Sequence, residues 1–329
     1  MKKKLNGARV LALVMGIVSA ALSNTSMAQT YPAKPVKVIV NYTPGGPTDL
    51  TARTVGGKMQ DITGQPFVIE NTPSANGAVG TQNLIRSVPD GYTIILSTAG
   101  HTSVAKALYE DKLPFDPFRD LAPISMTVNS NQLILAHPSL GVKTIAELVK
   151  LAKAKPGQLN YASPGVGTPN QLGMELFKIM TGTDILHVPY KGTAPMMQDM
   201  LAGRVQVLIN GAATVLPHIR SGKLIALASG WTSRAHAVPD VPTMEELGYK
   251  GFQVSTWFAL FAPVKTPAPI IARLNALAVQ SLADAQVIKV LDGAGFDSAS
   301  STPEYVTRLM REEYERWKKV IADAKIVAE

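Results

Sequence analysis

Short hydrophobic runs alternate with longer segments of helical period along most of the chain. The runs are rich in Val, Ile, Leu and Phe, which favours strands, whereas the segments between them repeat apolar positions every three or four residues, which favours helices. The predicted strands span residues 36–42, 67–70, 93–97, 133–136, 159–162, 185–188, 205–209, 224–228 and 252–261. Strands and helices that alternate in this way form βα units, so we expect mostly parallel sheets covered by helices.

This number of strands is large for one sheet and suits two, which predicts a two-domain α/β protein. Two long extended segments, 124–136 and 253–263, are predicted to carry the chain from one domain to the other and back. We therefore expect domain 1 to comprise residues 29–130 and 252–329, and domain 2 to comprise residues 131–251.

Several helices begin with recognisable capping residues. Thr144 is followed three positions later by Glu147, and Thr168 by Gln171, which is the spacing of a capping box. A last helix is predicted from about residue 303 to 324. Its apolar side contains one charged residue, Glu313.

The first 28 residues have the pattern of a secretory signal peptide. Three lysines and Arg9 precede the apolar run 10–22, and small residues lead to Ala28. We expect cleavage after Ala28 and export of the mature chain. The alternative is a membrane anchor, but this run is shorter than the ~20 residues that span a bilayer.

Composition narrows the class of protein. With 46% hydrophobic and 17% charged residues, the chain is typical of a globular protein. Residues 1–28 carry four of the basic residues and no acidic ones, so their removal lowers the formal charge from +8 to +4, and no basic cluster predicts binding to nucleic acid. The absence of cysteine excludes disulfides, thiolate metal sites, a cysteine nucleophile and a lipid anchor on cysteine.

The most informative segment is residues 43–49, which we call the first glycine loop. It follows a predicted strand and precedes a helix, and its candidate ligand-binding residues are Thr43, Pro44, Gly45, Gly46, Thr48 and Asp49. Glycine allows close approach of the backbone, and a helix N-terminus presents N–H groups that suit an anion such as a carboxylate. The alternative is a tight turn in which Thr48 or Asp49 only caps the helix.

A second loop of the same chemistry spans residues 163–169 in the other predicted domain. We call it the second glycine loop, and its candidate residues are Ser163, Gly165, Val166, Gly167 and Thr168. Two such loops, one from each domain, could hold one anion from both sides of a cleft. This pairing is stronger evidence for a binding site than either loop alone.

Three further candidates follow the strand at 93–97. Ser97, Thr98 and His101 are expected at the same sheet edge as the first glycine loop, because ligands of α/β proteins bind at the carboxyl ends of strands. His101 could equally be a polar residue in the first turn of a helix. Tyr190 could line the cleft with its ring and hydroxyl.

Known catalytic and cofactor motifs are absent. The glycine loops lack the nucleotide-binding patterns, the five histidines lack metal-ligand spacing, and no nucleophile elbow is present. We therefore expect neither a metal nor a cofactor, and no enzyme activity. An alternative that these residues leave open is a hydrolase or transferase with Asp49 or His101 as its base.

The chain resembles the substrate-binding proteins of tripartite tricarboxylate transporters, also called Bug receptors. The matching blocks are Pro-Gly-Gly-x-x-Asp at 44–49, Pro-Asp-Gly-Tyr-Thr at 89–93, Leu-Pro-Phe-Asp-Pro at 113–117, Tyr-Ala-Ser-Pro-Gly-Val-Gly-Thr at 161–168, His-Val-Pro-Tyr-Lys-Gly at 187–192, Asp-Val-Pro-Thr at 240–243 and Arg-Trp at 316–317. The chain departs from the usual pattern at Asn41 and Tyr42, where proline is frequent, at Gln171, where histidine often stands, and at Gln206, a usual aspartate position.

The resemblance implies a periplasmic binding protein of the Venus-flytrap type, similar to type II, with two α/β domains. It implies a di- or tricarboxylate or an aromatic carboxylate as ligand, held in the cleft by the two glycine loops. It also implies integral-membrane transporter subunits as partners of a monomeric receptor. A sensor that serves a signalling partner is a further alternative, because the outer surface has no recognisable docking motif.

Overall fold

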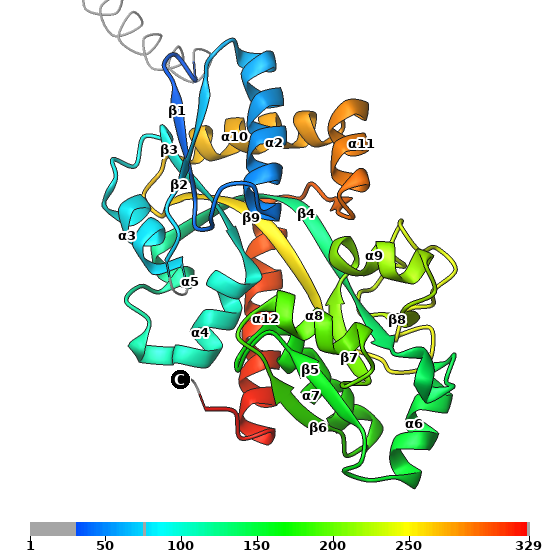
Figure 1. The fold of residues 1–329 in the computed structure, drawn as a ribbon. Helices are drawn as coiled ribbons and strands as arrows, with labels where there is room; N and C mark the ends of the chain where they lie inside the picture. Colours follow the sequence, from blue (N-terminus) through cyan, green and yellow to red (C-terminus); the bar gives the residue numbers. More distant parts are fainter. Residues whose placement is uncertain (1–30, 75–76, 328–329) are drawn as a thin grey trace, which may run out of the picture.

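The computed structural model describes residues 31–74 and 77–327, so the predicted signal peptide and its cleavage after Ala28 lie outside the described residues. In the described part of the chain the strands form one continuous ladder in the order β2-β1-β3-β9-β4-β7-β5-β6, and β8 and β10 also pair with β4. Figure 1 shows that this ladder passes through two lobes joined by long strands.

The first lobe is built on three parallel strands, β1 (Val36–Val40), β2 (Phe67–Asn71) and β3 (Thr93–Thr98). Successive side chains of a strand point to opposite faces of the sheet. Val38 and Val40 accordingly pack in the core beneath α2 (Pro47–Thr63) and α10 (Ala268–Leu282), whereas Ile39 packs with Leu84 of α3 (Ala78–Arg86) on the other face. Helix α11 (Ala285–Gly293) contacts α2 and enlarges the layer of helices on that face of the sheet.

The second lobe is built on β5 (Asn160–Ser163), which is parallel to both β6 (Leu186–Pro189) and β7 (Val207–Gly211). Its helices are α6 (Ile145–Ala154), α7 (Pro169–Thr181), α8 (Thr193–Leu201) and α9 (Ala212–Arg220). The capping box predicted at Thr144 and Glu147 is present at the start of α6. Apolar residues of β5 and β7 pack against α8 on one face and against α7 on the other.

Two strands connect the lobes. β4 (Leu121–Ala136) pairs antiparallel with β9 (Ser255–Pro263) as far as Asn131, and from Gln132 onward it pairs antiparallel with β7 and β8 (Ile225–Ser229). The predicted α/β fold with two helix-covered sheets is confirmed. Each sheet is mixed rather than uniformly parallel, because the connecting strands run against the three parallel strands of each lobe.

The carboxyl-terminal part of the chain packs behind the connecting strands. After the short β10 (Asp297–Ser298), helix α12 (Pro303–Asp323) runs along β4 and contacts α4 (Ser103–Tyr109) and α7. Glu313 on its apolar side is fully buried and accepts hydrogen bonds from Ser103 Oγ at 2.7 Å and Trp257 Nε1 at 2.9 Å. This charged residue therefore ties α12 to the start of α4 and to β9.

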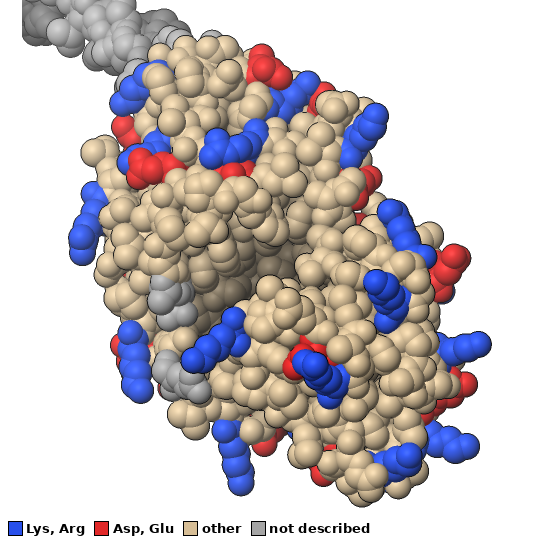
Figure 2. All heavy atoms as spheres, viewed as in Figure 1, with Lys and Arg blue, Asp and Glu red and all other residues tan. Residues whose placement is uncertain are grey.

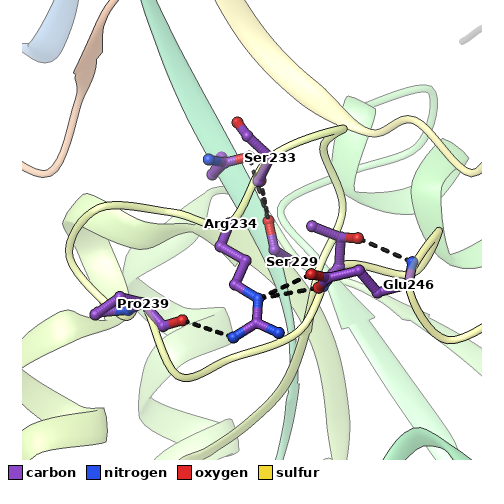
Figure 3. Close-up of polar contacts among 7 residues, drawn as sticks. Ser229, Ser233, Arg234, Pro239 and Glu246 are labelled. Carbon is purple, nitrogen blue, oxygen red and sulfur yellow. Dashed lines mark hydrogen bonds and ion pairs between the residues drawn. The ribbon is translucent and has the colours of Figure 1, made fainter.

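Short turns of helix complete the fold: η2 (Ala99–His101), η3 (Glu110–Lys112), α5 (Pro117–Asp120) and η4 (Pro138–Leu140). The segment between β8 and β9 is held by side-chain contacts rather than by a long helix (Figure 3). Arg234 Nε lies 3.0 and 3.1 Å from the carboxylate oxygens of Glu246, and its Nη1 donates to Pro239 O. No helix in residues 31–74 or 77–327 has both the length and the apolar character needed to cross a bilayer.

Candidate functional site

A cavity of about 320 Å³ lies between the two lobes. Figure 2 shows the molecule hollowed between its upper and lower halves, and the visible wall of the hollow is tan. The described residues that line the cavity are Tyr42, Thr98, Gly100, His101, Val104, Ala105, Leu108 and Tyr109 from the first lobe, Val166, Gly167, Thr168, Pro169 and Asn170 from the second, and Thr256 from β9.

The first-lobe wall forms where β1 and β3 end side by side. Val40 is paired with Leu96, so the residues that follow both strands meet at one sheet edge. Tyr42 Oη lies 2.8 Å from Thr98 Oγ1, and the Tyr42 ring stacks on His101 with centroids 4.5 Å apart and an interplanar angle of 9°. The sheet edge thus presents two stacked rings and a hydroxyl group to the cavity.

His101 lies in the 3-10 turn before α4. Burial lowers the pKa of its imidazole to about 4, and burial raises the pKa of Tyr42 to about 12. Both side chains are therefore uncharged at neutral pH. His101 Nδ1 has no hydrogen-bond partner among the described residues, and neither have the buried Asn41 Oδ1 and Ser97 Oγ at the same edge.

The first glycine loop is organised by Asp49. Gly45 has the left-handed φ of +80°, and its N–H donates to Asp49 Oδ2 at 2.9 Å. Asn71 Nδ2 and Arg53 Nε also donate to this carboxylate, each at 2.9 Å. Burial opposes the charge of Asp49, but these hydrogen bonds outweigh burial and hold its pKa below the ordinary value.

Helix α2 begins within this loop, with Gly46 as its N-cap and Pro47, which has no N–H, as its first residue. Gly46 has no side chain to accept hydrogen bonds from the first turn, and neither Thr48 nor Asp49 caps the helix. The backbone N–H groups of a helix start that lacks a side-chain cap carry partial positive charge and are available to an anion.

The second glycine loop is different, because side chains of the loop and of α7 accept hydrogen bonds from its backbone N–H groups. Gly165 N–H donates to Ser163 Oγ, which also lies 2.7 Å from His187 Nε2, and Gly167 N–H donates to Gln171 Oε1 at 2.6 Å. Thr168 Oγ1 accepts from Gln171 N–H and so caps α7. The predicted capping box is thus only half formed, because the Gln171 side chain bonds Gly167 rather than the backbone of Thr168.

The two lobes touch at Gly167. This residue has a φ of +75°, and a Cβ added to it would overlap Leu108 Cδ2 of α4 in the first lobe. The second glycine loop therefore closes directly onto α4.

The structure brings five of the fifteen predicted ligand-binding residues to the cavity, from both lobes. Thr98, His101, Val166, Gly167 and Thr168 line it. The other predicted residues are absent from the lining: Thr43, Pro44, Gly45, Gly46, Thr48, Asp49, Ser97, Ser163, Gly165 and Tyr190.

Some of these residues have structural partners instead. Tyr190 Oη donates to Asp199 Oδ2 at 2.8 Å, within the second lobe, and Ser97 and Ser163 are fully buried. The exposed residues Thr43, Pro44 and Gly45 follow Tyr42 directly, which places the first glycine loop next to the cavity wall.

Sequence reasoning missed several lining residues. Tyr42 carries a signal, because it stands between a strand and the first glycine loop. The sequence does not indicate Leu108 and Val104, since the side of a seven-residue helix that faces a cavity is not evident from its sequence. Among the described residues, no group of three histidine or acidic side chains is placed to hold a metal ion.

Comparison with known proteins identifies the family. The model described as "Tripartite tricarboxylate transporter family receptor" matches residues 51–326. Protein BugT of Bordetella pertussis is 35% identical over 320 residues, which cover 97% of this chain and 98% of that protein.

Two solved structures from Rhodopseudomonas palustris share the fold. Rpa4515 with adipate superposes with a TM-score of 0.74 at 32% identity, over 90% of this chain and 99% of that one. MatC with bound malate superposes with a TM-score of 0.71 at 32% identity, over 88% of this chain and 100% of that one. This chain therefore belongs to the tripartite tricarboxylate transporter receptor family, whose members are periplasmic solute receptors with the two-lobed α/β fold described above.

Proposed function

We propose that this protein is a periplasmic receptor that binds a small organic carboxylate between its lobes and delivers it to the membrane subunits of a tripartite tricarboxylate-type transporter. The single observation that carries the proposal is the cavity shared by the two lobes, whose wall includes Tyr42, the residue directly before the first glycine loop. The carboxylates bound by two members of the family, adipate and malate, support the same class of ligand.

Binding begins in the first lobe in this proposal. The carboxylate meets the free N–H groups at the start of α2, and the hydroxyl groups of Tyr42 and Thr98 lie at the adjacent sheet edge. Closure then brings the second glycine loop against α4, so that Val166 and Thr168 cover the ligand. The closed form is the state that the membrane subunits recognise.

The connecting strands β4 and β9 serve as the hinge. The pairing of β4 changes from β9 to β7 between Asn131 and Gln132, which supports a division into domain 1, residues 29–130 and 252–329, and domain 2, residues 131–251. We further propose that residues 1–28 are removed on export to the periplasm.

Isothermal titration calorimetry of the mature protein against a panel of organic acids tests the proposal. We expect saturable binding of at least one carboxylate, and weaker binding after Thr98→Val, which removes a hydroxyl group from the cavity wall. Lys150→Gln, on the outer face of α6, is the control and should leave binding unchanged. Indifference to every organic acid would contradict the proposal.

The catalytic alternative has weaker support. Asp49 is fully engaged by Gly45, Arg53 and Asn71, which leaves it poorly placed to accept a proton from a substrate. Incubation of the protein with each ligand that binds, followed by mass spectrometry, distinguishes the two. A receptor returns the ligand unchanged, whereas turnover that Asp49→Asn abolishes would establish an enzyme.

A further inference from the structure

We infer that His187 is a positioning residue: its neutral imidazole holds the second glycine loop in the shape that forms the cavity wall, so ligand affinity falls when the ring takes up a second proton. This inference rests on the proposed function and adds a pH dependence to it. It follows from the hydrogen bonds that join β6, α7 and the loop.

The hydrogen bonds of Gln171 determine which ring nitrogen of His187 carries the proton. Gly167 N–H can only donate, and Gln171 Oε1 accepts from it at 2.6 Å, so the other end of this amide is the NH2 group. The NH2 group lies 3.2 Å from His187 Nδ1, which must therefore accept and carry no proton. In the neutral imidazole the proton is then on Nε2.

The Nε2 side of the ring organises the rest of the loop. His187 Nε2–H donates to Ser163 Oγ at 2.7 Å, and this hydroxyl group also accepts from Gly165 N–H at 3.3 Å and donates to Gly165 O at 3.0 Å. Thr168 Oγ1 donates to the same carbonyl oxygen at 2.7 Å. The neutral ring is therefore linked to both parts of the loop, including two residues of the cavity wall, Gly167 and Thr168.

A second proton on the ring is incompatible with these hydrogen bonds. Protonated His187 would direct Nδ1–H at the NH2 group of Gln171, and a flip of that amide would direct the NH2 group at Gly167 N–H instead. Each arrangement sets two donors against one another, so the loop must change its shape. Because Gly167 contacts Leu108 of the first lobe, this change acts on the closed form that holds the ligand in the proposed mechanism.

The surroundings of the ring keep it neutral at pH 7. Burial is the largest influence and lowers the pKa of His187 below its ordinary value of 6.5. Two charged side chains of α7 act in opposite directions, since Glu175 raises this pKa and Lys178 lowers it, and they pair with each other at 3.0 Å. On β5, the ring of Tyr161 stacks on the imidazole with centroids 4.8 Å apart, and its hydroxyl group donates to Glu175. The ring should therefore take up its second proton at a pH below 6.5.

The pH dependence of ligand affinity tests this inference. Calorimetry with benzoate and with malate gives the ratio of affinity at pH 7.5 to that at pH 5.0, and this ratio should be at least about threefold larger in the wild type than in His187→Gln, which cannot take up a proton. Ionisation of the ligand itself cancels in this comparison. At pH 7.5, His187→Gln should bind more tightly than His187→Leu, because glutamine can still donate to Ser163. His218→Gln, on α9 and outside the cavity lining, is the control and should keep the wild-type ratio. Equal ratios in the wild type and His187→Gln would overturn the inference.

Gln171→Glu is a test that a merely structural role of His187 would not pass. The carboxylate can accept from both Gly167 N–H and a protonated Nδ1, so the relay would accommodate the charged ring. Its affinity should then fall less than that of the wild type between pH 7.5 and pH 5.0. A fall as large as in the wild type would contradict the inference.

Nitrogen-15 spectra of the wild-type protein test the same relay without any ligand. At pH 7.5 the proton of His187 should be on Nε2, and the amide signal of Gly167 should shift as His187 titrates. A proton on Nδ1, or a Gly167 signal that does not follow His187, would overturn the inference and leave the proposed function intact. Failure of every organic acid to bind, with the spectra as expected, would count against the proposed function alone.

Discussion

The contact between Gly167 and Leu108 leads to a quantitative prediction, because it joins the two lobes and belongs to the closed form in the proposed mechanism. Gly167→Ala adds a methyl group that overlaps Leu108 Cδ2. Overpacking of this kind costs about 1 to 3 kcal/mol, and a terminal methyl of leucine can partly move aside, so we take about 1 to 2 kcal/mol. This penalty applies to the closed form and should weaken ligand binding by about 5- to 30-fold.

The left-handed backbone at Gly167 adds a separate cost. Alanine in this conformation costs about 1 to 2 kcal/mol whether the lobes are open or closed, so it lowers the stability of the protein without opposing closure. Gly182→Ala is the matched control, because Gly182 has a φ of +62° at the end of α7 and no atom within 4 Å of an added Cβ. It should lose similar stability in urea unfolding and bind ligand normally.

A double variant isolates the contact. Leu108→Ala removes the overlapping atoms, so the affinity lost in Gly167→Ala should be largely restored in Gly167→Ala/Leu108→Ala when it is compared with Leu108→Ala alone. Calorimetry measures the affinities, and urea unfolding measures the shared backbone cost. If Gly167→Ala and Gly182→Ala bind ligand equally well, the Gly167–Leu108 contact is not part of the bound state and the reasoning fails.

Three further predictions concern stability, each measured by urea unfolding. The pKa of His101 is about 4 in the folded protein and its ordinary value is 6.5, so between these two pH values the unfolded state binds more protons than the folded state. The contribution of neutral His101 to the free energy of unfolding is therefore complete above pH 6.5 and is lost as the pH falls toward 4. The loss from pH 7 to pH 5 should be about 2 kcal/mol, and an identical pH profile in His101→Gln would refute it. Glu313→Leu leaves Trp257 without an acceptor and Ser103 with only its longer bond to Ala99 O, and should be about 2 kcal/mol less stable than Glu313→Gln, which keeps an acceptor for both. Equal stability would show that the two hydrogen bonds to Glu313 contribute nothing. Thr168→Ala removes the cap of α7 and should cost about 1 kcal/mol, whereas Thr168→Ser should restore it, and failure of serine to do so would argue against capping.

Much of the fold follows from local patterns in the sequence. The predicted connecting segments 124–136 and 253–263 correspond closely to β4 and β9, because both are rich in apolar residues and neither has a glycine or an internal proline to end a strand. The last helix, predicted from about 303 to 324, is α12, Pro303–Asp323. Its period is clear because one side is apolar over the whole helix except at Glu313.

Contacts between distant segments could not be predicted in this way. Glu313 interrupts an apolar stripe because Ser103 and Trp257, which are 210 and 56 positions away, donate to it. Asp49 was expected to bind ligand or cap a helix, but its partners include Asn71, 22 positions away, which no local motif indicates. The same holds for Leu108, whose role depends on the approach of the second lobe.

The position of a bound carboxylate tests the account most directly. A crystal structure of the protein with 4-bromobenzoate, in which anomalous scattering marks the bromine, would locate both ends of the ligand. We expect the bromine between α4 and Val166, and the carboxylate at the start of α2 near Gly46. A ligand outside the space between the lobes, or one whose carboxylate points away from α2, would contradict it.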